Sequence, residues 1–217
     1  MGGSTLRRVD PSAERRATLA DAWGWWASTL TELEPAAWNR PTRLPGWDVA
    51  ALVAHASLLV RGLQFLVARP VDVEPTVHSA RDLLTRFNEP GGLATTFAGQ
   101  VAEAARQQAA SLPPQDLVAL FTITAPEVIA ASEAAGPIVV DYFGTARVPF
   151  DVALSIAALE AVVHGLDLCD SCDLSPASIP QSSMDHTVQL LASMAPAVDF
   201  IDAATGRRDT EVLPVLH

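Results

Sequence analysis

The sequence contains no lysine, and all 14 of its basic side chains are arginines. This absence excludes Schiff-base and aldolase-type chemistry and a Walker P-loop, because each needs an amine at a defined position. Against the arginines stand 25 acidic residues, which give a formal net charge of -11. No basic stripe is left for a phosphate backbone, so we expect no nucleic-acid partner.

The sequence also lacks a long uncharged apolar run. Its stretch of residues 152–168 is the most apolar, but it carries Glu160, His164 and Asp167. We therefore expect no membrane-spanning helix and no membrane partner. The first ten residues hold no apolar segment of the length that a signal peptide needs, and two cysteines are too few for a disulfide framework. Together these features predict a cytoplasmic protein.

The length and the apolar periodicity predict one globular, mainly all-α domain. The chain has 217 residues, of which 49% are hydrophobic and 18% charged, so disorder is excluded as its main state. Four long amphipathic segments and a fifth, later one favour a helical bundle with a long crossover between the second and third helices. The expected helices span residues 11–34, 48–68, 93–111, 149–171 and 181–196, with a short helical candidate at 77–87 in the crossover.

The segment between residues 117 and 148 has a different texture. Two short β-branched and aromatic runs, Phe121–Thr124 and Ile138–Phe143, are separated by proline and glycine. They predict either two short strands or extended loops between the third and fourth helices, and the pattern does not separate these readings. We expect a tail over residues 1–10, the bundle over residues 11–200, and an irregular C-terminal tail over residues 201–217.

Three residues form a candidate metal site. Glu160 and His164 are four residues apart, so both project from one face of a helix. A buried carboxylate needs a partner, and a metal ion can satisfy it and the imidazole together. His55, on the buried stripe of the second helix, supplies a third ligand if the two helices face each other. The alternative is that His55 is an ordinary core histidine and that Glu160 and His164 pair only with each other.

Two strings in the sequence carry a family resemblance. The string PTRLPGWDVAALVAH at residues 41–55, combined with EAVVHGLDL at residues 160–168, resembles the signatures of the mycothiol-dependent maleylpyruvate isomerase family. That family belongs to the DinB-like superfamily of metal-binding four-helix bundles. The resemblance implies a DinB-like bundle in which His55, Glu160 and His164 bind a divalent metal, most often Zn²⁺. It also implies mycothiol or a similar low-molecular-weight thiol as cosubstrate.

Asp167 lies one turn beyond His164 and is the candidate catalytic residue. It either accepts a hydrogen bond that orients a metal ligand or forms a polar wall of the pocket, or else it is a buried carboxylate bonded to the backbone; the spacing leaves these alternatives equal. Cys169 and Cys172 form a C-x-x-C at an expected helix C-terminus, where the helix dipole has the wrong sign for a reactive thiolate. We expect two ordinary thiols.

The site and the resemblance predict a metal-dependent thiol S-transferase or cis–trans isomerase. A metal-held thiolate would be the nucleophile toward a small electrophilic substrate. The family's isomerase carries an additional C-terminal domain, whereas residues 197–217 alone follow the fifth helix here, so an S-transferase is as plausible as the isomerase. The alternatives are a thiol-independent metal enzyme, such as a hydrolase or lyase, and a non-catalytic small-molecule-binding bundle. We expect a monomer or homodimer.

Overall fold

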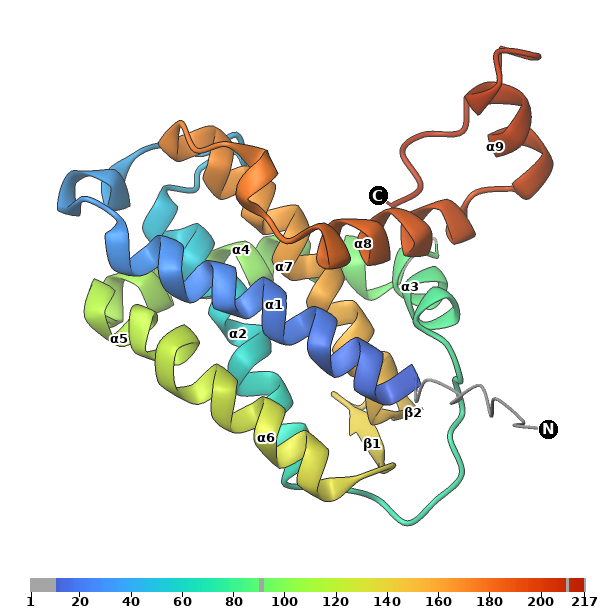
Figure 1. Ribbon diagram of the computed structural model, residues 1–217, viewed down its shortest axis with the longest axis horizontal. Helices are drawn as coiled ribbons and strands as arrows, with labels where there is room; N and C mark the ends of the chain where they lie inside the picture. Colours follow the sequence, from blue (N-terminus) through green and yellow to red (C-terminus); the bar gives the residue numbers. More distant parts are fainter. Residues whose placement is uncertain (1–10, 90–91, 210, 217) are drawn as a thin grey trace, which may run out of the picture.

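The computed structural model describes residues 11–89, 92–209 and 211–216, and the tail expected at residues 1–10 lies outside them. The fold is mainly helical, as the sequence predicts, and its core is a bundle of α1, α2, the joined helices α5 and α6, and α7 (Figure 1). In chain order the helices are α1 Pro11–Glu32, α2 Val49–Val67, α3 Ala80–Asn88, α4 Leu93–Ser111, α5 Pro114–Ala119, α6 Ala125–Ala135, α7 Phe150–Cys172, α8 Gln181–Met194 and α9 Ala197–Ala204.

Helix α7 lies at the centre of the bundle and packs against α1, α2 and α8. It is buried on nearly every side, which explains its almost continuous apolar sequence. Helix α1 contributes a stripe of Leu19, Trp23, Trp26 and Leu30, all at most 2% exposed. The Trp26 indole Nε1 donates a hydrogen bond of 2.9 Å to a main-chain carbonyl of α7. The two helices are therefore joined by both packing and a buried polar contact.

The third helix of the bundle is not the one that the sequence predicts. Residues 93–111 do form a helix, but α5 and α6 take the bundle position. Both readings left open for Phe121–Thr124, a short strand or an extended loop, are wrong. That run lies in a π-helical turn, Leu120–Thr124, because Leu117, Phe121 and Ala125 recur at helical spacing and are buried. Pro126 cannot donate to the helical ladder, and the shift to a wider turn directly before it accommodates the missing N–H.

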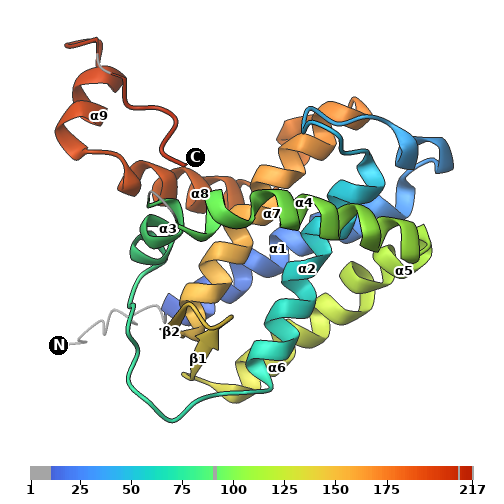
Figure 2. The ribbon, with the colours of Figure 1, turned by 180° about the vertical axis from the view of Figure 1, so that it is seen from behind.

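Helices α3 and α4 form the crossover from α2 to the rest of the bundle. Seen from behind, α4 runs across the outer side of α2 (Figure 2). The Gln108 side chain joins the two helices, with its amide nitrogen 3.2 Å from the Ser57 hydroxyl. The short helix expected at residues 77–87 is present as α3, which begins after a Ser79 cap.

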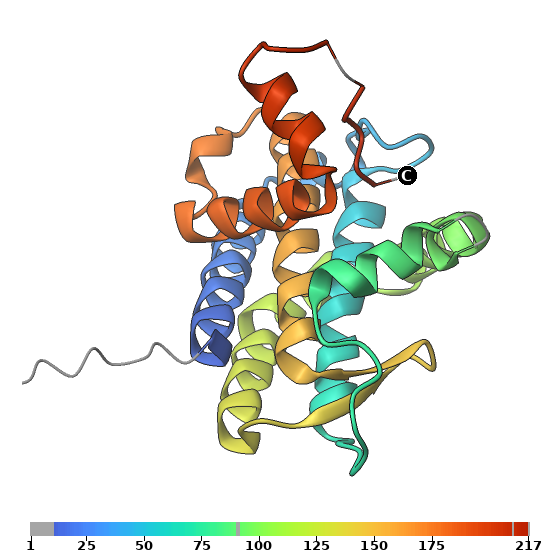
Figure 3. The same ribbon diagram turned by 90° about the vertical axis from the view of Figure 1, so that its right-hand side faces the viewer.

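A two-stranded antiparallel hairpin precedes α7. Strand β1 spans Val139–Tyr142 and β2 spans Ala146–Pro149, with Tyr142 opposite Ala146. The run at Ile138–Phe143 is thus a strand, one of the two readings left open by the sequence. The hairpin lies beside the C-terminal half of α2 and the start of α7 (Figure 3).

The expectation of an irregular C-terminal end is wrong for α9. This helix spans Ala197–Ala204, so the domain boundary expected at residue 200 falls inside it. Pro196 precedes the helix and Gly206 follows it with a φ of 66°, which is the usual placement of these residues at helix ends. Its apolar side chains Val198 and Ile201 are exposed, at 67% and 57%. Because α9 buries no apolar face, the sequence has no periodic apolar stripe that predicts this helix.

Within the described part of the chain, three helical segments have the length and apolar composition of a helix that crosses a membrane: α2, the segment Pro114–Ala135, and α7. The expectation that no helix spans a membrane rests on the charged groups in α7, and by length and composition alone it is not supported. In the fold, 78% of the most apolar window of α7 and 56% of that of α2 are buried inside the bundle. Burial in the protein core therefore accounts for the composition of these two helices.

Candidate metal centre

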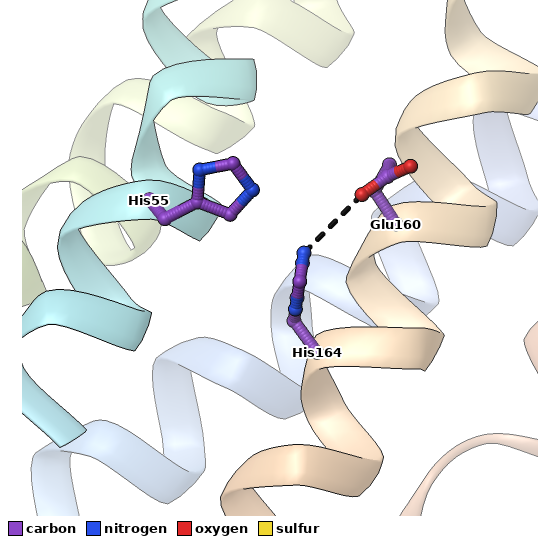
Figure 4. Close-up of side chains that lie close together, drawn as sticks. All are labelled: His55, Glu160 and His164. Carbon is purple, nitrogen blue, oxygen red and sulfur yellow. Dashed lines mark ion pairs between the residues drawn. The ribbon is translucent and has the colours of Figure 1, made fainter. Parts of the chain in front are cut away.

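The three candidate ligands lie between two facing helices. His55 is on α2, whose first turn is capped by the Asp48 carboxylate at 2.8 Å from the Ala51 N–H. Glu160 and His164 lie one turn apart on α7 and project toward α2 (Figure 4). One ligand atom from each of the three lies within 4.8 Å of the others. The structure thus brings together the residues that the sequence proposed.

A chain of polar contacts extends from the ligands to the surface. The His164 Nε2 atom is 3.3 Å from a carboxylate oxygen of Glu160, and its Nδ1 atom is 2.9 Å from a carboxylate oxygen of Asp167. The other oxygen of Asp167 accepts a hydrogen bond of 2.5 Å from the Nε of Arg43. Asp167 therefore contacts a candidate ligand. The alternative, a carboxylate bonded to the main chain, is not what the described residues show, because both carboxylate oxygens accept from side chains.

Burial and neighbouring charges shift the pKa values of the two histidines in opposite directions. Burial, followed by the nearby His164, lowers the pKa of His55 to about 4. Burial acts to lower the pKa of His164 too, but the hydrogen bonds to Asp167 and Glu160 outweigh it and raise that pKa to about 9. At neutral pH the metal-free site thus holds one neutral and one protonated imidazole.

The carboxylates are kept ionised by the same contacts. Burial acts to raise the pKa of Glu160, but the hydrogen bond and charge of His164 outweigh it and leave this pKa below its usual value. For Asp167, burial is likewise outweighed by the hydrogen bonds from His164 and Arg43, and its pKa is lowered. Both groups are therefore anionic at neutral pH and favour a cation between the helices.

The donor set fits a divalent metal. Two imidazoles and one carboxylate are the protein ligands of many catalytic zinc sites, which keep a further position open. Glu160 keeps 31% of its side chain exposed and His164 keeps 13%, so the site is accessible from solvent. Among the described residues, the protonated His164 forms the ion pair with the Glu160 carboxylate, and a metal ion would replace that proton.

The two histidines are held in different ways. The Nδ1 of His164 is fixed by Asp167, which directs its Nε2 toward Glu160. The Nδ1 of His55 is buried and has no hydrogen-bond partner in the described part of the chain. Instead, the Trp47 ring packs edge-on against the His55 ring at 5.0 Å between centroids. The turn before α2 therefore contributes to the site through packing.

The sequence as a whole matches a known family. The family model described as the mycothiol maleylpyruvate isomerase N-terminal domain matches residues 19–169, which is more than half of the chain. The chain belongs to this family. The matched residues include all three candidate ligands of the mycothiol maleylpyruvate isomerase domain, as well as Asp167 and Arg43. The resemblance stated from the two sequence strings is thereby confirmed.

Two solved structures share the fold of this mycothiol maleylpyruvate isomerase domain. One is the crystal structure of the mycothiol-dependent maleylpyruvate isomerase, at 18% identity and a TM-score of 0.54, covering 84% of this chain and 68% of that one. The other is a histidine-to-alanine mutant of the same enzyme, at 19% identity and a TM-score of 0.53, with the same coverage. No curated protein matches the chain. The fold prediction is confirmed, and the prediction of an enzyme is confirmed at the level of the family.

Sequence reasoning did not predict that Arg43 contacts Asp167 or that Tyr142 lies near Glu160. Nothing in the sequence singles out Arg43 among the 14 arginines except its place in the first family string. Tyr142, the only tyrosine, lies near Glu160, whose charge acts on its pKa. No spacing rule links a hairpin residue to a helix that follows it.

The remaining candidates lie away from the ligands. Cys169 and Cys172 are free thiols in the last turn of α7, and burial raises the pKa of both, which is the opposite of a reactive thiolate. His78 and His186 line a separate cavity of about 670 Å³ between α1, α3, α7 and α8.

Proposed function

We propose that this protein is a metal-dependent enzyme that uses mycothiol, or a similar small thiol, to isomerise or S-conjugate a small electrophilic substrate. The observation that carries the proposal is the convergence of His55, Glu160 and His164 within 4.8 Å, in a chain that belongs to the mycothiol maleylpyruvate isomerase family. A divalent ion bound there, most often Zn²⁺ in such sites, lowers the pKa of a coordinated thiol so that it is a thiolate at neutral pH.

The chain's own residues have distinct tasks in this proposal. His55, Glu160 and His164 would hold the ion. Asp167 accepts a hydrogen bond from the Nδ1–H of His164 and so would keep the Nε2 atom directed toward a bound ion. Arg43 uses its Nε for Asp167 but keeps half of its side chain exposed, so its guanidinium is available for an acidic group of the thiol or the substrate.

The proposed reaction begins with addition of the thiolate to an activated double bond. Reversible addition to a cis alkene turns the double bond into a single bond, which rotates before the thiolate leaves; this is isomerisation. Addition or displacement that is not reversed gives a stable conjugate; this is S-transfer. The related enzyme of known structure is named for maleylpyruvate isomerisation, so we propose a cis-alkene conjugated to a carbonyl as the substrate class.

The proposed cosubstrate and the free cysteines favour a cytoplasmic enzyme. Mycothiol-type cosubstrates require a reducing compartment, and both cysteines of the chain are free. We propose that the protein acts there on small molecules, as a monomer or a homodimer.

The test is thiol dependence of turnover. Zinc-loaded protein is mixed with maleylpyruvate, or with monobromobimane as a displacement substrate, in the presence and absence of mycothiol. We expect turnover of at least one electrophile with mycothiol and none above background without it. The variant His55→Ala should lose this turnover, whereas His186→Gln, a histidine outside the site, should retain it. Turnover without thiol would favour a thiol-independent metal enzyme, and its complete absence would favour a non-catalytic bundle; either result contradicts the proposal.

A further inference from the structure

A closed turn in front of α2 holds the main chain of Arg43. Within residues 40–48, the Thr42 N–H donates to the Trp47 carbonyl at 2.9 Å, and the Trp47 N–H donates to the Leu44 carbonyl at 3.1 Å. The Thr42 hydroxyl spans the same turn, because it donates to the Trp47 carbonyl at 3.0 Å and accepts from the Leu44 N–H at 3.1 Å. The main chain of Arg43 therefore lies between two residues that are anchored on both sides.

The side chain of Arg43 is held by one edge only. Its Nε donates at 2.5 Å to a carboxylate oxygen of Asp167, whose side chain is 4% exposed. Neither Nη atom of Arg43 has a hydrogen-bond partner in the part of the chain that the structure describes, and 52% of this side chain is exposed. A guanidinium carries five N–H donors in a planar fork, of which the contact with Asp167 uses one. The Nη edge therefore remains open to an anion from solvent.

Arg43 lies at one end of the stripe on α7 that carries the site. His164 contacts the carboxylates of both its stripe neighbours, Glu160 at 3.3 Å and Asp167 at 2.9 Å. Asp167 is three residues beyond His164, which is about 4.5 Å along the helix axis. One imidazole and one carboxylate thus separate the guanidinium of Arg43 from the space that the three ligands surround. A single small molecule can span that separation.

An acidic substrate needs such a cation at this site. The chain has a formal net charge of -11, and Glu160 and Asp167 are anionic, so their field acts against the approach of a carboxylate. Arg40, in the same turn, is not equivalent to Arg43. Its Nη1 lies 3.3 Å from the Asp173 carboxylate, beyond the end of α7. Arg40 is therefore the natural comparison for Arg43, since it is also exposed and ion-paired but does not contact the site.

We propose that the Nη edge of Arg43 binds a carboxylate of the electrophilic substrate and so makes the enzyme select electrophiles that carry one. The inference rests on the proposed function, and it assigns the acidic group to the electrophile and not to the thiol. The thiol would be held by its sulfur, whereas the electrophile needs an anchor of its own to orient its double bond. The contact with Asp167 fixes the guanidinium before the substrate binds. Arg43 is thus a specificity-determining residue, and it takes no part in making or breaking bonds.

The experiment compares an acid with its own ester. The compound para-carboxybenzylideneacetone and its methyl ester share one carbonyl-conjugated alkene and differ by a negative charge. The value of kcat/KM is measured for both with zinc-saturated protein and mycothiol, above the rate without enzyme. We expect the wild type to prefer the acid. Arg43→Gln should lower the acid-to-ester ratio of kcat/KM by about 10–100-fold, the effect of one hydrogen-bonded charged group, mainly through KM for the acid. An effect that passes through Asp167 to the zinc acts on both electrophiles and cancels in this ratio.

The matched control is Arg40→Gln, which should keep the wild-type ratio. Arg43→Lys keeps the charge without the planar fork and should recover part of the preference for the acid. The role of Arg43 would be overturned by a wild type without that preference, by an unchanged ratio in Arg43→Gln, or by an equal fall in Arg40→Gln. A rise in KM for mycothiol alone would place the acidic group on the thiol and overturn it too.

Monobromobimane separates this inference from the proposed function. A wild type that reacts with monobromobimane but with neither the acid nor the ester would overturn the role of Arg43 alone. A wild type that reacts with none of the three would overturn the proposed function on which that role rests.

Discussion

The metal-free protein should become less stable as the pH rises above neutrality, because of His164. The pKa of this side chain is about 9 in the fold against 6.5 when unperturbed; burial acts to lower it, but hydrogen bonds to Asp167 and Glu160 outweigh burial. A group whose pKa is raised by folding stabilises the fold fully below its unfolded pKa, and this contribution disappears as the pH rises through its folded pKa. The shift corresponds to about 3 kcal/mol, lost between about pH 6.5 and 9 at roughly 1.4 kcal/mol per pH unit.

In the folded protein, the other site groups do not titrate in this window. The pKa of His55 is lowered to about 4, and those of Glu160 and Asp167 are lowered from values that are already acidic. His164 itself is 13% exposed, so solvent screens its contacts little.

The assay is urea unfolding of chelator-treated protein between pH 6.5 and 8.5. The free energy of unfolding of the wild type should fall across this range, and that of His164→Gln should not. His186→Gln is the matched control, since burial lowers the pKa of His186, whereas that of His164 is raised. The slope of this variant should equal that of the wild type. A flat wild-type profile, or an equal slope in His164→Gln, would refute the reasoning.

Two further predictions follow from the contacts around the site and the core. Asp167→Asn removes the charge that fixes His164, so the affinity for zinc, measured in competition with a chromophoric chelator, should fall by about 10–100-fold. The control is Asp173→Asn, which changes an exposed partner of Arg40 and should leave the affinity unchanged. Equal affinities in the two variants would be inconsistent with the role of Asp167. Trp26→Ala removes a fully buried indole that donates a hydrogen bond to α7 and stacks on Phe121. The free energy of unfolding, measured in urea, should therefore fall by about 3–5 kcal/mol. A loss below about 1 kcal/mol, the scale of one methyl-sized deletion, would contradict this packing.

The parts of the fold that the sequence predicts are those with a buried apolar stripe. The apolar stripe of Leu19, Trp23, Trp26 and Leu30 predicts α1, and Asp48, as an N-cap, predicts the start of α2. The identity of the third bundle helix could not be obtained in this way. β-branched and aromatic residues at Phe121–Thr124 suggest a strand locally, and tertiary burial of Phe121 against Trp26, whose rings stack at 5.2 Å, overrides that preference.

The same distinction holds for the candidate site: residues on one helix are predictable from spacing, and contacts between elements are not. Glu160, His164 and Asp167 are close in sequence on one helix, so spacing alone places them on one face. His55 needed the further assumption that α2 faces α7, which the structure supports with ring centroids 4.8 Å apart. The contact of Arg43 with Asp167 and the position of Tyr142 depend on loop and hairpin geometry, which no periodicity encodes.

The most direct test of the account is the metal content of the purified protein. Plasma mass spectrometry would be applied to the wild type, His55→Ala and His164→Ala, purified identically without chelator and checked for folding by circular dichroism. We expect one equivalent of a divalent metal in the wild type and a sharp loss in both variants. Little metal in the wild type, or equal metal in all three proteins, would contradict the assignment of His55, Glu160 and His164 as a metal centre.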